Sequence, residues 1–558
     1  MRRPAMGMAP RFLLPNLAAM LAAATLFYCL FLYGAGEKLF RDSDSGWHIR
    51  NGESILANRA LPRTDPYSFS KAGQPWVSWE WGSDVLMGMA HRAGGLRALT
   101  ALFSLTISAA SWLWCRLSFA AGGDFLLAGV FAPLMITTTS AHWLARPHIF
   151  SWIFLLGVLL CMEKWTVGRT SLSARVPLDP LPQETDDINR SSVLPRLPER
   201  PTRASAADQG VRPTIGRLLL VASASALWAN LHASFFLFPA IALIYAASHL
   251  LRPLLWQLDT QTERAKAAWF LYVALAALGG SFLNPYGWQL HAHVFQYLWN
   301  DRLTSQIAEF QSFNFHEPDA AQMALTMGLA AAGGILALSQ KKLAHFLLAA
   351  MFLWAGLRSA RVLPLVALLI LPLANAAFAE ALRNARGLRE PLRRALDAAL
   401  AYSARLRRID LRLGGWAFSA LAIAASLLLL QTPAYSRRIG FPPATFPVAA
   451  SQAVEQLPAG ARILTSDSYG GYLIYRFAGA RKVYFDGRSD FYGADFLKQY
   501  VVLMEARPGW RGIVSSSGFT HALLPSASVL NAALQQAGWT TLYRDGVATL
   551  LGRTNMVH

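Results

Sequence analysis

The chain has 558 residues, of which 54% are hydrophobic and 15% are charged, and its formal net charge at pH 7 is +19. This composition excludes an ordinary soluble enzyme and a single small domain, and it predicts a polytopic membrane protein. The arginines gather in short runs beside apolar segments, as in cytoplasmic loops, so membrane topology and anionic lipid explain the charge better than nucleic acid.

The N-terminal segment predicts how the chain enters the membrane. A membrane span needs about 20 mostly apolar residues, and Lys and Arg collect on the cytoplasmic side. Arg2, Arg3 and Arg11 precede or open the first apolar run, at 12–35, and place the N-terminus inside. The polar stretch that follows is therefore expected outside, as an external loop over 36–95.

Further apolar runs predict about eleven spans in total, which brings the C-terminus outside. The later runs are 96–115, 124–142, 147–164, two within 217–252, 267–283, 322–339, 344–357, 362–379 and 414–431. The Pro- and Arg-rich segment 166–216 predicts a disordered cytoplasmic linker, and 383–412, with nine arginines against three acids, also belongs inside. Residues 284–321 form a second external segment whose aromatic residues suit an amphipathic interfacial helix.

The fold class predicted is therefore an α-helical polytopic membrane domain, 1–434, followed by an external soluble α/β domain, 435–558. In the second domain, strand-like and helix-like segments alternate. The strand-like ones are ARILT (461–465), RKVYFDG (481–487), THALL (520–524) and the hairpin WTTLYRD/VATLLG, and the helix-like ones are SYGGYLIYRF, ADFLKQYVVLMEA and VLNAALQQAG. No dinucleotide or phosphate-loop motif follows any of these strands, so no nucleotide is assigned.

Two carboxylates two residues apart, Asp42 and Asp44, open the first external loop, and His48 follows. This spacing suits two kinds of chemistry: oxygen ligands for a divalent metal such as Mg²⁺ or Mn²⁺, or a general base whose neighbour sets its position and pKa. The alternative is a solvated loop without chemistry. Glu80 stands among tryptophans, whose faces suit both sugar rings and the membrane interface.

Other ionisable residues lie at predicted outer turns. Arg146 and His148 fall between the third and fourth spans, His232 between the fifth and sixth, and Arg358 and Arg361 between the ninth and tenth. Outer arginines oppose the positive-inside trend, and charge near a bilayer is costly, so function is the default hypothesis. A lipid phosphate would suit their guanidinium forks. The alternative is that they snorkel to the interface or pair with a carboxylate such as Glu309.

The stretch DSDSGWHIRNGESILANRALPRTDPYSFSKAGQPWVSWEWGSDVL (42–86) resembles the first-external-loop signature of a bacterial family of multi-pass proteins. That family belongs to the GT-C superfamily of membrane glycosyltransferases, as do the protein mannosyltransferases. Further stretches fit the same family along nearly the whole chain outside 166–216: ARPHIF (145–150), WANLHASF (228–235), NPYG (284–287), IAEF (307–310), RSARVLPL (358–365) and YFDGRSDFYG (484–493). Ala233 and Phe310 depart from the glycine and tryptophan expected there.

The resemblance implies a sugar transferase that uses a polyprenyl-phosphate-linked donor at the outer face of the bacterial cytoplasmic (inner) membrane. It implies that Asp42 or Asp44 is the base that deprotonates an external acceptor in an inverting displacement, with His48 and Glu80 as second choices. Some GT-C enzymes require a divalent metal, and Asp42 with Asp44 would be its ligands here.

The same resemblance implies the residues that bind the donor phosphate. Arg358 and Arg361, with Arg146, would neutralise the charge that develops on the leaving phosphate. His148 and His232 lie at the same predicted face and join this group.

Two other functions stay open. One is a polytopic transporter or a flippase of lipid-linked glycans, in which the arginines line a phosphate pathway. The other is a non-catalytic membrane scaffold whose external domain recruits partners. A transporter needs polar residues at mid-membrane and an inward route, whereas the polar residues here gather near one face.

Overall fold

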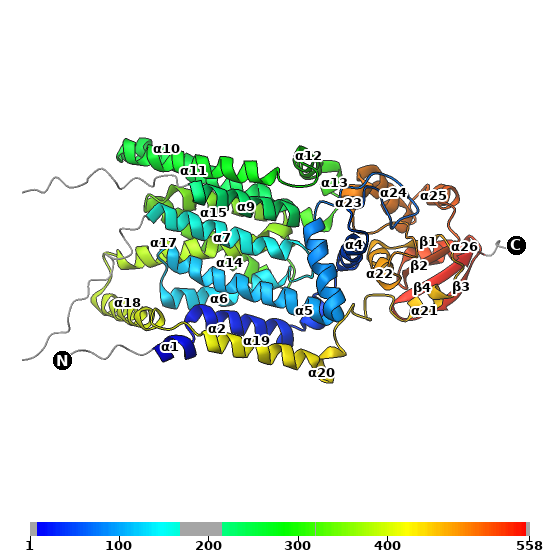
Figure 1. Cartoon of the computed structure of the whole chain (residues 1–558), viewed down its shortest axis with the longest axis horizontal. Coiled ribbons are helices and arrows are strands. Elements are labelled where there is room, and N and C mark those ends of the chain that lie inside the picture. The colour runs from blue at the N-terminus through cyan, green and yellow to red at the C-terminus, as the bar shows by residue number, and fades with distance from the viewer. Residues whose placement is uncertain (1–7, 168–214, 319, 554–558) are drawn as a thin grey trace, which may run out of the picture.

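The computed structural model describes residues 8–167, 215–318 and 320–553. Long helices run side by side along the longest dimension of the molecule, and a small sheet-containing unit caps one end of this bundle (Figure 1). The predicted linker lies outside the described residues, except for the few at its two ends that belong to helices.

Helices of the described chain coincide with every predicted span. They are α2 (Leu17–Phe27) continued by the π-helical turn η1 (Tyr28–Leu32), α5 (Trp81–Ala120), α6 (Phe125–Ser140), α7 (His148–Val167), α9 (Ile215–Leu231), α10 (Leu237–Trp256), α11 (Thr260–Ser281), α14 (Ala320–Ser339), α15 (Leu343–Arg358), α16 (Leu363–Leu365) with η5 (Val366–Ile370) and α17 (Leu371–Arg383), and α19 (Trp416–Gln431).

Length and composition alone allow six stretches of the described chain to cross a membrane: Arg11–Leu32, Trp81–Ala120, His148–Thr166, Ala233–Trp256, Ala320–Ser339 and Ala360–Arg383. Four shorter helices, α6, α9, α15 and α19, are apolar as well. Large apolar side chains such as Leu219, Leu254, Ile335 and Leu421 are exposed along the bundle, as expected where the surrounding medium is lipid. The number of about eleven spans stays a prediction.

Small residues let the bundle helices approach closely. A Cβ on Gly280 of α11 would lie 2.1 Å from the carbonyl oxygen of Ala222 in α9, and one on Gly333 of α14 would lie 2.3 Å from the Cβ of Ala374 in α17. Where helices are surrounded by lipid, burying apolar side chains between them gains little free energy, so they associate through close backbone contacts of this kind.

Helix α5 consists of two straight parts. Gly94 and Gly95 have non-helical backbone angles, and Gly95 (φ 62°, ψ −152°) occupies a region that other residues rarely adopt. The predicted span 96–115 begins directly after this turn. The preceding part packs against α4 (Asp44–Asn58), which lies across the end of the bundle (Figure 1).

The two ends of the bundle differ in character. One end carries α1 (Met8–Leu13) and the arginine-rich α18 (Glu390–Asp410) (Figure 1). The other end carries α3 (Ala35–Lys38), α4, η2 (Ala233–Phe236), α12 (Trp288–Leu298), α13 (Asp301–Thr304), η3 (Ala308–Phe310), η4 (Ala360–Val362) and α20 (Pro433–Ser436). Helix α12 buries Leu290 and Val294 and exposes Trp288 and Phe295, which agrees with the amphipathic helix predicted for the second external segment.

The C-terminal unit is built on a four-stranded sheet of order β1-β2-β4-β3, in which β1 and β2 are parallel and the other neighbours antiparallel. Its elements are α21 (Ala450–Glu455), β1 (Ile463–Thr465), α22 (Asp467–Arg476), α23 (Ser489–Tyr492), α24 (Ala494–Met504), α25 (Trp510–Ser517), β2 (His521–Pro525), α26 (Val529–Gln536), β3 (Trp539–Arg544) and β4 (Ala548–Arg553).

The strand predicted at 481–487 is wrong in detail, because only isolated bridges from Val483 form there. The N–H of Val483 donates to the carbonyl of Tyr67 and its carbonyl accepts from the N–H of Phe69, both at 3.0 Å. The segment therefore pairs with the predicted first external loop as well as with β1. The other predicted strands and helices of this unit are confirmed, while its limits at 435 and 558 stay a prediction.

A buried charge cluster fastens the C-terminal unit to that loop. Arg488 is 2% exposed, and its guanidinium pairs with Asp486 at 2.7 Å and with Asp65 of the first loop at 2.8 Å. It also lies 4.7 Å from the ring centre of Trp76. Because leaving a buried charge unpaired costs about 3–5 kcal/mol, these contacts hold the two segments in one arrangement.

The glycine contact between α4 and α5 gives a first prediction. A Cβ on Gly52 would lie 1.7 Å from the carbonyl oxygen of Asp84, so Gly52→Ala forces the helices apart and should destabilise the fold by about 1–3 kcal/mol or more. Thermal unfolding in detergent measures the change. Gly129→Ala in α6 is the matched control, since its Cβ would meet nothing within 4 Å, and equal unfolding temperatures for the two variants would contradict this packing.

Candidate active site

A cavity of about 1890 Å³ lies where the end of the bundle meets the C-terminal unit. Its walls come from the first external loop, the turns α6–α7 and α9–α10, residues 297–312, the turn after α15, and residues of 467–501. It brings together eight of the nine residues predicted for a site: Asp42, Asp44, Glu80, Arg146, His148, His232, Arg358 and Arg361. The ninth, His48, does not line the cavity.

Arg146 joins the two predicted carboxylates. Its Nη1 lies 2.7 Å from Oδ2 of Asp42 and its Nη2 lies 2.8 Å from Oδ2 of Asp44. Nη1 also lies 3.5 Å from Oε1 of Glu309, which precedes α14. Three segments far apart in the sequence thus meet at one guanidinium.

Local hydrogen bonds fix the positions of these groups. Oδ1 of Asp42 accepts the backbone N–H of Asp44 at 2.9 Å and closes the turn that starts α4. The turn before Arg146 is tied to the same region, because the hydroxyl of Ser45 donates to the carbonyl of Ala145 at 3.0 Å and the N–H of Ala145 donates to the carbonyl of Leu39 at 2.8 Å.

The protonation of the buried Asp44 differs from that of the partly exposed Glu309. Burial raises the pKa of Asp44 to about 7, although Arg146 acts in the opposite direction. Burial alone would raise the pKa of Glu309 too, but Arg361 and Arg146 together lower it to about 2. Asp44 is therefore able to exchange a proton near neutral pH, whereas Glu309 stays an anion.

His48 lies behind the cavity wall. Its Nδ1 is 2.5 Å from Oδ1 of Asp84, and its ring stacks on Trp47 with centroids 3.6 Å apart. Burial, assisted by Arg146, lowers the pKa of His48 well below its usual value, so the ring is neutral at pH 7. Its Nε2 is 3.8 Å from Oε2 of Glu80, which is too far for a hydrogen bond, so His48 packs behind Glu80 without bonding to it.

Glu80 stands between His48 and the cavity. Its Oε1 is 3.4 Å from Nε2 of His232, whose Nδ1 lies 2.8 Å from the hydroxyl of Ser234. Burial, with Asp84 adding to the effect, raises the pKa of Glu80 to about 8. At pH 7 this side chain is therefore mostly an uncharged acid that can donate a hydrogen bond into the cavity.

The two outer arginines have different surroundings. Arg361 lies 3.2 Å from Oε2 of Glu309 and 5.0 Å from the ring centre of Phe310. Arg358 is exposed and lies 5.3 Å from the ring centre of Trp354. No carboxylate of the described residues forms an ion pair with Arg358, so its guanidinium is available to an anionic ligand.

His148 contributes less than the arginines. Its Nε2 donates to the carbonyl of His142 at 2.9 Å, which takes one ring nitrogen away from any ligand. His148 and His232 therefore offer a ligand only the polar nitrogen atoms of their rings, whereas the arginines offer it positive charge.

Part of the cavity wall is apolar. Phe236, Trp299 and Trp354 line it and are themselves 38%, 71% and 61% exposed, while Trp152 and Phe352 line it deeper in the bundle. An apolar wall that continues to an exposed aromatic rim suits a ligand with a hydrocarbon part.

Sequence reasoning missed two groups of the site: Asp490 lines the cavity, and Asp84 orients His48 from behind it. Glu309 also lines the cavity, and the sequence predicts it only as a carboxylate that pairs with an arginine, which its contacts with Arg146 and Arg361 confirm. Glu309 lies in the IAEF stretch and Asp490 in the YFDGRSDFYG stretch, so these stretches carried the available signal. Asp84 lies in the 42–86 stretch, which carried the same kind of signal for it.

The donor set does not fit the divalent metal proposed for Asp42 and Asp44. Both Oδ2 atoms face the Arg146 guanidinium, so a positive charge already occupies the position between them. Within 8–167, 215–318 and 320–553, no three side chains of His, Cys, Asp or Glu are arranged to hold a metal ion.

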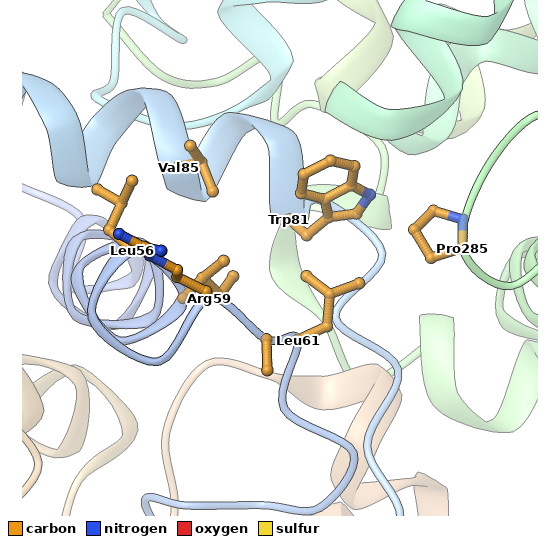
Figure 2. A pocket seen from close by; sticks show the side chains of 8 residues that line it. Leu56, Arg59, Leu61, Trp81, Val85 and Pro285 are labelled. Atoms are coloured by element: carbon orange, nitrogen blue, oxygen red, sulfur yellow. The ribbon is translucent and has the colours of Figure 1, made fainter.

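A second cavity, of about 520 Å³, lies beside the first external loop and α5 (Figure 2). Leu56, Leu61, Trp81, Val85 and Pro285 form its mostly apolar lining, and Arg59 lies at one side. It contains none of the predicted site residues, so we assign it no chemistry.

Comparisons with known proteins identify the fold. No family model and no curated protein matches the sequence. The structure is similar to the oligosaccharyltransferase of Archaeoglobus fulgidus tethered to an acceptor peptide containing the NVT sequon, with a TM-score of 0.52 and 12% identity over 91% of this chain and 68% of that one. It is also similar to oligosaccharyltransferase AglB of Archaeoglobus fulgidus in complex with an inhibitory peptide and a dolichol-phosphate, with a TM-score of 0.52 and 12% identity over 97% and 74%.

The predicted helical bundle with a C-terminal α/β unit agrees with the fold of these oligosaccharyltransferases, while membership of the GT-C superfamily stays a prediction. An identity of 12% shows the fold alone. The bacterial family, its likeness to protein mannosyltransferases and the membrane topology stay predictions.

The contact between Gly487 and Asp44 gives the second prediction. A Cβ at Gly487 would lie 1.8 Å from Oδ1 of Asp44, so Gly487→Ala should push the Asp44 carboxylate away from Arg146. We expect a lower unfolding temperature and faster hydrogen exchange in the first turn of α4. Gly460→Ala is the control, because its Cβ would meet nothing within 4 Å. Equal exchange rates in the two variants would show that the C-terminal unit does not constrain Asp44.

Proposed function

We propose that this chain is a GT-C type glycosyltransferase that moves a sugar from a polyprenyl-phosphate-linked donor to an external acceptor, with inversion at the anomeric carbon. We place the reaction at the outer face of a bacterial cytoplasmic membrane. One observation carries the proposal: a single cavity combines the paired carboxylates, outer arginines and an apolar wall that reaches an exposed aromatic rim. The dolichol-phosphate named for the archaeal neighbour supports a lipid-phosphate donor.

Asp44 is the proposed base. In an inverting displacement, the acceptor atom forms a bond to the anomeric carbon, the bond from that carbon to the phosphate oxygen breaks, and the acceptor proton moves to Asp44. A pKa of about 7, caused mainly by burial, suits this task because an effective base has a pKa near the working pH. Asp42 positions Asp44 through the hydrogen bond to its N–H.

Arg358 and Arg361 are the proposed ligands of the leaving phosphate. A lipid phosphate leaves with its negative charge, and cations held close to that charge stabilise the transition state. Arg358 has no carboxylate partner among the described residues, and Arg361 shares Glu309 with Arg146. The exposed ring of Trp354 beside Arg358 gives the lipid chain an apolar surface.

The C-terminal unit supplies the opposite wall and, we propose, the acceptor side. Ser468, Ser489 and Tyr500 line the cavity with hydroxyl groups, and Asp490 adds a carboxylate that accepts from Nε2 of His293 at 3.1 Å. Polar groups of this kind orient an acceptor by hydrogen bonds. The acceptor peptide named for the archaeal neighbour supports an acceptor with polar groups.

A transporter or flippase, and a non-catalytic scaffold, stay alternative predictions. The geometry favours the transferase over a transporter, because the cavity lining comes from one end of the described bundle and none of it from α1 or α18 at the other end (Figure 1). A transport route would need polar residues that continue towards that end.

The base assignment predicts a pH dependence. A base must be ionised to accept a proton, so kcat/KM should fall about tenfold per pH unit below about 7, where Asp44 becomes protonated. Asp44→Asn should lower the rate by about 10²–10⁴-fold at pH 8. Release of undecaprenyl phosphate from undecaprenyl-phosphate mannose or glucose, by protein in nanodiscs, measures both effects.

Asp495→Asn is the matched control, because Asp495 is an exposed carboxylate of α24 that does not line the cavity. We expect the wild-type rate and pH profile for this variant. Full activity in both Asp42→Asn and Asp44→Asn would remove the base from this pair.

The donor site can be tested without turnover. Arg358→Gln with Arg361→Gln should weaken binding of undecaprenyl phosphate to the protein in nanodiscs by at least about tenfold, because two charge-assisted contacts are lost. Arg437→Gln is the control, since Arg437 is an exposed arginine near α20 that does not line the cavity. If the double variant binds with wild-type affinity, the two arginines only snorkel to the interface.

A further inference from the structure

The position between Asp42 and Asp44, where a divalent metal would be expected, is occupied by a side chain. The two Nη atoms of Arg146 each take one Oδ2 atom, at 2.7 and 2.8 Å, and Glu309 approaches the same guanidinium at 3.5 Å. Carboxylates from two segments of the chain thus surround one positive charge, as carboxylates surround a bound cation.

The surroundings of Arg146 hold this charge rigidly. Hydrogen bonds of its neighbour Ala145 to Leu39 and to Ser45 fix the turn that bears it. A guanidinium is always charged and has five N–H groups in a planar fork, so it can bind several oxygen atoms at once. It therefore supplies a permanent positive charge in a fixed place, which is what a coordinated cation supplies.

Arg146 also faces the space where a ligand would lie. It lines the cavity, its side chain is 16% exposed, and the three carboxylate contacts use its two Nη atoms without enclosing the group. Arg361 reaches the other oxygen of Glu309 at 3.2 Å, so Glu309 connects the fixed charge to the arginines of the proposed donor site.

We propose that Arg146 takes the place of a divalent cation in this protein: it holds Asp42, Asp44 and Glu309 together, adds a fixed positive charge for the donor phosphate, and makes the reaction independent of metal. The inference rests on the proposed transferase function for its catalytic part. Its structural part, a guanidinium in place of a metal ion, stands without it.

The charges predict what happens when Arg146 is replaced by alanine. Removing Arg146 leaves Asp42, Asp44 and Glu309 without the cation that they share, and uncompensated carboxylates attract a divalent ion. The variant R146A should therefore gain a metal site that the wild-type protein lacks.

Mn²⁺ is the probe. With purified full-length protein in nanodiscs, free Mn²⁺ is counted by its electron paramagnetic resonance signal during titration. We expect no stoichiometric binding to wild type, about one Mn²⁺ bound per R146A molecule, and loss of that binding when D42N is added. R146Q, which keeps the size and hydrogen-bonding capacity of the side chain better, replaces R146A if the latter does not fold. A folded R146A or R146Q that binds no Mn²⁺ overturns the inference.

The Mn²⁺ titration of the wild-type protein can still overturn the inference if both Arg146 variants unfold. Binding of one Mn²⁺ to wild type that is lost in D42N would show that the carboxylates hold a metal despite Arg146, and would overturn the inference.

Activity adds an independent readout. EDTA should leave wild-type release of undecaprenyl phosphate unchanged, whereas R146A should lose about 100-fold and regain at least tenfold with Mn²⁺. Wild-type activity that EDTA abolishes overturns the inference and leaves the transferase proposal intact. Absence of turnover under every condition contradicts the proposed function, while the Mn²⁺ titration still decides the role of Arg146.

Discussion

The ion pairs of Arg146 with Asp42, Asp44 and Glu309 are the interaction on which the cavity depends. Asp44 is buried and the other three groups are partly shielded from water, and a charge in such a place is tolerated only when partners compensate it. The first external loop, the turn between α6 and α7, and the segment before α14 therefore have to meet at one point. Once they meet, the remaining polar side chains of the turns at this end of the bundle face a common cavity.

The same constraint makes the C-terminal unit part of the site. Arg488 is compensated both by Asp486 of its own segment and by Asp65 of the first loop, so neither segment can leave without exposing a charge in an apolar setting. Gly487 precedes Arg488 and allows the backbone to touch the Asp44 carboxylate, where any side chain would clash. The ion pairs of Arg488 thus hold the C-terminal unit against the proposed base, Asp44.

Local patterns predicted the parts of this structure that depend on local physics. Apolar runs of about 20 residues located the bundle helices. Arg146 stood out because a charge at the end of such a run is costly, and Asp42 stood out because a second carboxylate, Asp44, lies two residues further on. The pairing of Arg146 with both carboxylates could not be predicted, since it joins positions about a hundred residues apart. Val483 is a second example. Its extended segment was predictable from the sequence, but its pairing with the first loop depends on a partner far away in the chain.

The arrangement also connects the proton transfer with the departure of the phosphate. In the ion pair, the negative charge of Asp44 offsets part of the positive charge of Arg146. On the proposed mechanism, Asp44 becomes neutral as it accepts the acceptor proton, so the field of Arg146 is less compensated at the moment when negative charge develops on the leaving phosphate. A cation whose partner is also the base therefore acts more strongly in the transition state than in the ground state, which is the condition for an interaction to accelerate a reaction. An exposed arginine such as Arg358 lacks that additional effect, because no titrating carboxylate of the described residues pairs with it, and on the proposed mechanism it acts on the leaving phosphate with a constant compensation of its charge.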